Sequence, residues 1–266
     1  MSIISLCKTC EKRGFDFKQG IVCSLTNAKP TFSGHCPEFI KDASVKEFHG
    51  LKLRPNGERS TALIFLIWIV LVLEVLIIIS SGMQHSLLTT IASGGYVSDE
   101  AANFNDLRVQ LLAILYIVAY VISGIAFIMW FRRAYFNLHQ KVNTLSYGEE
   151  WAAGGWFVPV VNFYRPFQIM QELYNETRKF IQNGEGSHSI DLSTKYLGLW
   201  WTLWLINGIA GQIAFRVARH ASTLDDLIVS SKVDVVSGVI GIVLSFITVR
   251  IVRDYARVEG MLFSKA

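Results

Sequence analysis

The chain has 266 residues, of which 52% are hydrophobic and only 17% are charged, and its mean hydropathy is +0.37. A soluble domain carries roughly a quarter charged residues, so this composition excludes a disordered chain and an ordinary cytosolic enzyme. The formal net charge of +4 is small and dispersed, which argues against a nucleic-acid partner.

All four cysteines lie in residues 1–40: Cys7, Cys10, Cys23 and Cys36, with the spacing C-x2-C-x12-C-x12-C. A segment this short cannot bury enough core to fold unaided and usually needs a metal or a cross-link. Four thiolates suit a structural, tetrahedral zinc ion, so the sequence predicts a zinc module. Cys23 and Cys36 are not a second Cys-x-x-Cys pair, and two alternatives stay open: four free cysteines, or a redox pair at Cys7 and Cys10.

The pattern from Phe15 to Phe39, with Gly20, Cys23, Pro30 and Cys36 between them, resembles a cysteine-rich, zinc-ribbon-like module at the front of various bacterial proteins. The resemblance implies a bacterial origin and supplies no activity. Residues 41–59 are polar and basic and are predicted to form a linker.

Four apolar runs follow, at about 61–80, 107–131, 197–218 and 233–252. Each reaches the roughly 20 residues that a helix needs to cross about 30 Å of hydrocarbon. The runs show no period-two alternation, which disfavours a β-barrel. We therefore predict an all-α membrane protein, a four-helix transmembrane bundle over residues 60–255, with a tail at 256–266.

A few polar side chains interrupt the spans. Glu74 is the one charge inside the first run, and Arg108, Asn207 and Arg216 lie in the second and third. A charged group at the centre of a membrane helix costs about 2.5–3.5 kcal/mol on insertion scales. We expect Glu74 to face the bundle interior, either in an ion pair with Arg108 or Arg216 or as a proton or cation site.

Small residues repeat on the fourth run at Ser237, Gly241 and Ser245. Such a stripe allows close helix packing, within the bundle or between copies in a homo-oligomer.

The connection between the second and third spans contains an apolar stretch at 151–163. It is too short to cross a membrane, and Gly154, Gly155 and Pro159 interrupt a regular helix, so a re-entrant or interfacial segment is predicted. Residues 167–183 have the apolar periodicity of a helix along the membrane surface. Arg132, Arg133 and Arg165 suit the head groups of anionic membrane lipids, or they anchor the chain at the interface.

Several motifs of this region occur together. They are Arg132, Arg133 and Asn137, then Trp156, Pro159, Asn162, Arg165, Pro166 and Glu172, then the tryptophans at 200, 201 and 204. Over about residues 60–255 this combination resembles the bacterial family of domain of unknown function 4328. The resemblance implies four spans with the Trp-Phe-x-Pro…Asn…Arg-Pro block between the second and third, and no biochemical activity.

Lysine and arginine set the expected orientation. Ten precede the first span, none lies at 81–106, and seven lie between the second and third spans. By the positive-inside rule both termini are cytoplasmic, in a multi-pass protein of the bacterial inner membrane.

Metalloprotease, serine-hydrolase, phosphate-loop and dinucleotide-binding signatures are absent from the sequence, so we expect no enzyme activity. The leading hypothesis is a scaffold or sensor that binds an unidentified cytoplasmic protein through its zinc module. The alternative is a small transporter or channel with Glu74 as its ionisable site.

Overall fold

The computed structural model describes residues 7, 10–16, 20–28, 36–40, 42, 53–142, 145–182 and 192–264. The chain divides into two compact units, Met1–Leu51 and Lys52–Ala266. The boundary falls inside the segment predicted as a linker.

The first unit contains a short antiparallel hairpin of β1 (Arg13–Asp16) and β2 (Gly20–Cys23), with Arg13 opposite Cys23 and Asp16 opposite Gly20. Cys23 also forms a bridge with Ala28. Asn27, between them, has a φ of 51°, a left-handed conformation that asparagine tolerates better than most residues. A hairpin this small needs further support to be stable, as the sequence predicts.

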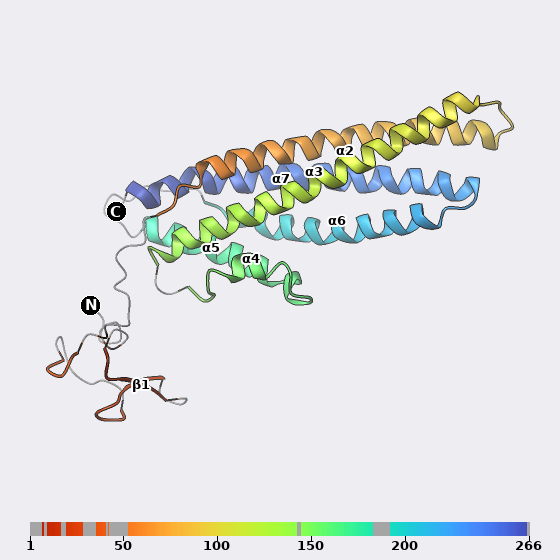
Figure 1. The fold of residues 1–266 in the computed structure, drawn as a ribbon. Helices are drawn as coiled ribbons and strands as arrows, with labels where there is room; N and C mark the ends of the chain where they lie inside the picture. The colour runs from red at the N-terminus through yellow and green to blue at the C-terminus, as the bar shows by residue number, and fades with distance from the viewer. Residues whose placement is uncertain are drawn as a thin grey trace. The chain divides into compact units, whose positions relative to one another are not determined.

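Four long helices dominate the second unit: α2 (Gly57–Ala92), α3 (Asp99–His139), α6 (Lys195–His220) and α7 (Leu224–Ser264). They lie side by side, and their packing order is α3, α2, α7, α6 (Figure 1). Between α3 and α6 the chain forms α4 (Trp151–Gly154), the 3-10 turn η1 (Val161–Phe163) and α5 (Arg165–Gln182). We call the end where α2 begins and α7 ends the proximal end. The distal end holds the α2–α3 and α6–α7 connections.

Side chains cap the distal ends of α3 and α7. Ser98 precedes α3 and accepts a hydrogen bond from the Ala101 amide at 3.3 Å. Before α7, the Asp226 carboxylate accepts from the Thr223 amide at 3.0 Å, and the Thr223 hydroxyl accepts from the Asp226 amide at 3.2 Å. This reciprocal pairing satisfies amides that a helix start leaves free. Both helices therefore begin at defined residues.

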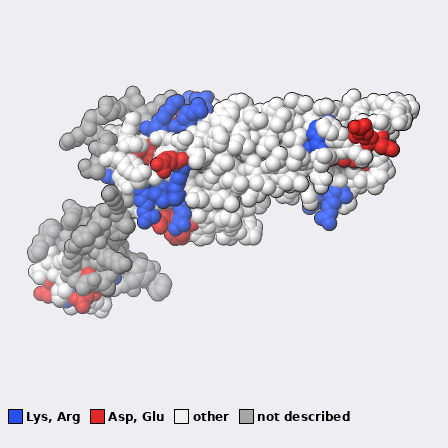
Figure 2. All heavy atoms as spheres, turned by 45° about the horizontal axis from the view of Figure 1, so that its top comes forward, with Lys and Arg blue, Asp and Glu red and all other residues white. Residues whose placement is uncertain are grey.

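Three of the described helices are long and apolar enough to cross a membrane: α2, α3 and α7. The third predicted span, 197–218, lies in α6, which is a helix of 26 residues but is interrupted by polar residues such as Asn207 and Gln212. The prediction of a membrane protein is thus supported by three helices, and a fourth span stays a prediction. In the view of Figure 2, Lys, Arg, Asp and Glu gather near the two ends of this unit, and the surface between them carries none.

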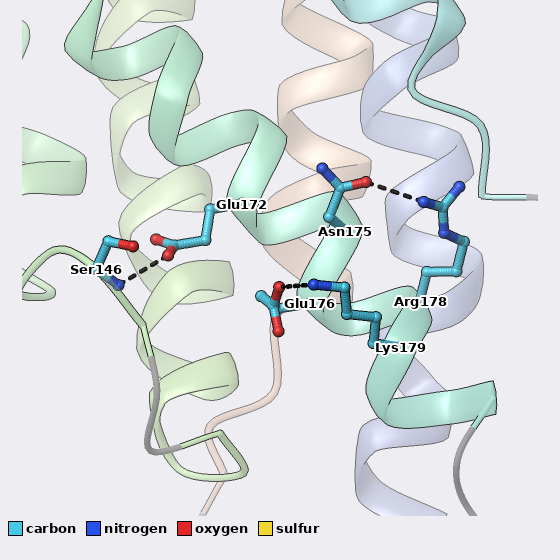
Figure 3. Close-up of polar contacts among 6 residues, drawn as sticks. All are labelled: Ser146, Glu172, Asn175, Glu176, Arg178 and Lys179. Atoms are coloured by element: carbon cyan, nitrogen blue, oxygen red, sulfur yellow. Dashed lines mark hydrogen bonds and ion pairs between the residues drawn. The ribbon is translucent and has the colours of Figure 1, made fainter.

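Helix α5 lies beside the proximal half and is amphipathic. Its buried face carries Ile169, Met170, Leu173 and Ile181 among others, each at most 1% exposed. On the outer face, Lys179 binds Glu176 at 2.6 Å and Arg178 donates to Asn175 at 3.0 Å (Figure 3). The helix predicted at 167–183 is present as Arg165–Gln182, with Pro166 in its first turn, where proline is tolerated, and its place along a membrane surface stays a prediction.

Candidate functional site

Aromatic side chains close the proximal half between α3 and α6. Trp156, from the segment after α4, lies 5.6 Å from Phe127 of α3 and 5.4 Å from Trp204 of α6, measured between ring centroids. Trp201 stacks on Trp204 at 4.8 Å. Trp200 is 2% exposed and donates its indole N–H to Thr248 of α7 at 3.1 Å. We call Phe127, Phe131, Trp156, Trp200, Trp201 and Trp204 the aromatic plug.

The segment 151–163, predicted to be re-entrant or interfacial, turns sharply at Val160. Pro159 precedes it, and the Val161 amide donates to the Pro159 carbonyl at 2.8 Å across a φ of 67° at Val160. This γ-turn is of the rarer, strained kind, and a β-branched residue rarely adopts a positive φ. Trp156 points inward, whereas Phe157, Val160 and Phe163 are 74%, 70% and 58% exposed.

Arg165 and Glu172 have separate partners. The guanidinium of Arg165 lies over the ring of Tyr147 at 4.3 Å, with Trp151 and Tyr164 within 5.6 Å. The Glu172 carboxylate accepts from the Tyr135 hydroxyl and, at 2.7 Å, from the Ser146 amide (Figure 3). Oδ1 of Asn162 and Nε of Arg165 are buried and have no protein partner among the described residues. Arg165 and Glu172 thus hold the segment between α3 and α5 through contacts with Tyr147, Tyr135 and Ser146.

A buried polar network joins three helices near the proximal end. The Asn137 amide nitrogen of α3 donates to Glu259 of α7 at 2.9 Å and to the Arg54 carbonyl at 2.8 Å. Its oxygen accepts from the Arg54 amide at 2.9 Å, and Asn56 also donates to Glu259. Arg132 is exposed and Arg133 half-buried on the same turn. Asn137 was singled out by the sequence motif, but Glu259 was not.

The distal half contains a cleft of about 1000 Å³, lined by α2, α3, α6 and α7. Its lining includes Glu74 of α2, Tyr116 and Tyr120 of α3, and Asn207 of α6. Arg216, Arg219 and His220 line it where α6 ends, and Asp234 lines it from α7. The cleft follows from the packing order, because α3 and α6 are the two outer helices and the aromatic plug joins them only in the proximal half.

Glu74 is 3% exposed, as expected for a group that faces the bundle interior. Its carboxylate accepts from the hydroxyls of Tyr116 and Ser245, each at 3.4 Å, which is long for such a bond. It also lies directly on Gly241, where an added Cβ would stand 2.1 Å from the carboxylate oxygen. The small-residue stripe of α7 is therefore used inside the bundle, against α2.

The two predicted arginine partners lie elsewhere. Arg108 donates to the Ser80 hydroxyl at 3.0 Å and to Asn105 at 2.7 Å. Arg216 lines the distal part of the cleft, at the outer end of α6. Among the described residues, neither forms an ion pair with Glu74. The expected pairing is replaced by the two hydroxyl contacts.

The four cysteines of the first unit line one pocket of about 320 Å³ and are free thiols. Burial, and then the neighbouring thiols of Cys10, Cys36 and Cys23, raise the pKa of Cys7. Within the described ranges, no three His, Cys, Asp or Glu side chains are close enough together to hold a metal ion. The thiols thus share a pocket without the arrangement of a closed zinc site.

Sequence reasoning missed one residue of the cleft lining, one partner of Glu74 and one residue of the polar network. Asp234 of the cleft was not considered, and Ser245, which donates to Glu74, was interpreted only as a packing residue. Both depend on the register between α7 and its neighbours. Glu259 lies seven residues beyond an apolar run, and its burial follows from the continuation of α7 past that run.

Among models of known families, that of the domain of unknown function (DUF4328) matches residues 93–257. The matched region covers α3 to α7, so Glu74 and the cysteines lie outside it. No curated protein and no solved structure matches the chain.

Proposed function

Since the match covers more than half of its length, the chain belongs to the DUF4328 family, and from that premise we propose that it is a non-enzymatic membrane protein that binds a small amphipathic ligand in the distal cleft. This develops the transporter-like alternative of the sequence rather than the scaffold. The family name assigns no activity, so the proposal rests on geometry.

The observation that carries the proposal is a buried carboxylate in a large, mainly apolar cleft. Ligand sites are typically concave and apolar, with a few convergent polar groups. A volume of about 1000 Å³ lies at the upper end of the usual range for ligand sites. Glu74, Tyr116 and Asn207 supply polar groups to its lining.

The placement in the membrane is part of the proposal. We propose that α6 is a fourth span, that the bundle lies in a bacterial inner membrane, and that the proximal end is cytoplasmic. The cations Arg54, Arg59, Arg132, Arg133 and Arg253 at that end support this orientation. Phe157, Val160 and Phe163 would then enter the lipid interface, with Arg132 and Arg133 near anionic head groups.

Native mass spectrometry of the gently extracted full chain tests ligand binding. We expect one small amphipathic molecule per chain, absent from the Gly211→Trp variant. Gly211 lines the cleft and has open space at its Cβ, so the indole fills the cleft without displacing the backbone. Gly124→Trp is the matched control, because Gly124 of α3 also has open space and lies outside the cleft. Equal retention in both variants would contradict the proposal.

A second candidate function is a scaffold that binds a cytoplasmic partner protein through a zinc module in the first unit. The shared pocket of Cys7, Cys10, Cys23 and Cys36 favours it. Binding of one zinc by the four thiols would release thiol protons. Elemental analysis of the full chain is expected to give one zinc per chain, lost in Cys23→Ser and kept in Ser24→Ala. A metal-free chain with four titratable thiols would remove this candidate.

A further inference from the structure

We propose that the ligand of the distal cleft is an organic cation with apolar substituents, bound by the Glu74 carboxylate where Tyr116 and Tyr120 line the cleft. This inference rests on the proposed function and names its ligand class. It joins three observations: an acidic group in the lining without a cationic partner, the tyrosine rings of the same lining, and the shortage of metal ligands.

The first observation is an uncompensated carboxylate. Glu74 is 3% exposed, and its described partners are two neutral hydroxyls at 3.4 Å. Arg108 is occupied by Ser80 and Asn105. An acidic group removed from water without a cation tends to keep its proton, and a bound cation would favour its ionised form.

Two aromatic rings in the same cleft lining are the second observation. The rings of Tyr116 and Tyr120 are stacked with centroids 5.8 Å apart and an interplanar angle of 29°, and both residues line the cleft. The face of an aromatic ring attracts a cation within about 6 Å, and quaternary ammonium groups are recognised in this way. Glu74 and the tyrosine pair thus offer a charge and a polarisable surface to the same ligand.

The rest of the cleft selects an organic cation over a metal ion. A hard metal ion takes six or more oxygen ligands, and beside Tyr116 and Tyr120 the cleft offers a single carboxylate, that of Glu74. Most of the remaining lining is apolar, with residues such as Leu112, Ile117 and Phe215. The distal part carries one acid, Asp234 on α7, against Arg216, Arg219 and His220 on α6, so it does not itself favour a cation. The preference for a cation over an anion therefore depends on Glu74.

Two probes of the same shape and opposite charge test the inference: tetraphenylphosphonium and tetraphenylborate. Calorimetric titration of the full chain in detergent is expected to show one phosphonium per chain and much weaker binding of the borate. Glu74→Gln should weaken phosphonium binding roughly tenfold or more, because it removes the acidic group beside the tyrosine pair. Tyr120→Leu should weaken it several-fold. Gly124→Trp should leave it unchanged.

Each other outcome overturns the inference. Equal binding of both probes, unaffected by Glu74→Gln and abolished by Gly211→Trp, would leave ligand binding in the cleft intact but remove its preference for cations. Phosphonium binding that survives Gly211→Trp would lie outside the cleft. If the wild-type chain does not bind phosphonium, the cation inference fails, and the molecule retained in native mass spectrometry decides the proposed function separately. Should Glu74→Gln fold poorly, Tyr120→Leu and Gly211→Trp carry the same test.

Discussion

The proximal and distal halves of the bundle are built from the same four helices but packed in different ways. In the proximal half, the aromatic plug and the Asn137–Glu259 network fill the space between helices, and Trp130, Phe131 and Tyr135 have no exposed surface. In the distal half, α3 and α6 part around the cleft, and Ile117 and Phe215 are 60% and 65% exposed. The difference indicates that stability is concentrated in one half, which leaves the other free to hold a ligand.

The largest effect is expected from the aromatic plug. Trp200→Ala removes a large side chain that is 2% exposed, together with its hydrogen bond to Thr248. We expect a loss of about 3–5 kcal/mol in the free energy of unfolding, measured by denaturant titration in detergent. Phe215→Ala, in the distal half, removes an exposed ring and should cost under about 1 kcal/mol. Equal losses in the free energy of unfolding for the two variants would contradict the inference that stability is concentrated in the proximal half.

A smaller effect is expected from the polar network. Asn137→Ala takes one of two amide donors from the buried Glu259 carboxylate, which keeps Asn56, and releases both backbone groups of Arg54. A buried group that loses a partner costs about 1–3 kcal/mol, so we expect a loss of that size in the same titration. Asn175→Ala, at the half-buried outer face of α5, is the control and should change stability by less than about 0.5 kcal/mol. A neutral Asn137→Ala variant would mean that the network does not tie the proximal end together.

The smallest effect on stability is expected where Gly241 of α7 contacts the Glu74 side chain. An alanine at Gly241 would meet the Glu74 carboxylate, which is the flexible end of its side chain and can swing into the cleft. We expect a loss of about 1 kcal/mol, because two weak hydrogen bonds between helices are given up. Gly208→Ala, on a cleft residue with open space, should be close to neutral. If Gly241→Ala proves as harmful as Trp200→Ala, the distal half is more rigid than the cleft suggests.

The sequence predicts much of the proximal half and little of the distal cleft. Long apolar runs locate α2, α3 and α7, and the apolar periodicity of 167–183 locates α5, because these signals are local. The burial of Glu74 also follows from the cost of exposing it to lipid. Its partners do not follow, since they depend on which helices touch and in what register. Nothing in the sequence places Ser245 against Glu74 while Arg108 turns to Ser80.

The two hydrogen bonds between the Asn137 side chain and the Arg54 backbone have a mechanical consequence. Both backbone groups of Arg54 are bound to α3, and Asn56, two residues on, is bound to Glu259 of α7. A pull on the chain before residue 53 therefore loads α3 and α7 at once, rather than lifting the first turn of α2 by itself. The segment before α2 is thus tied to α3 and α7 by hydrogen bonds. A force applied to it would be distributed over helices that also line the cleft.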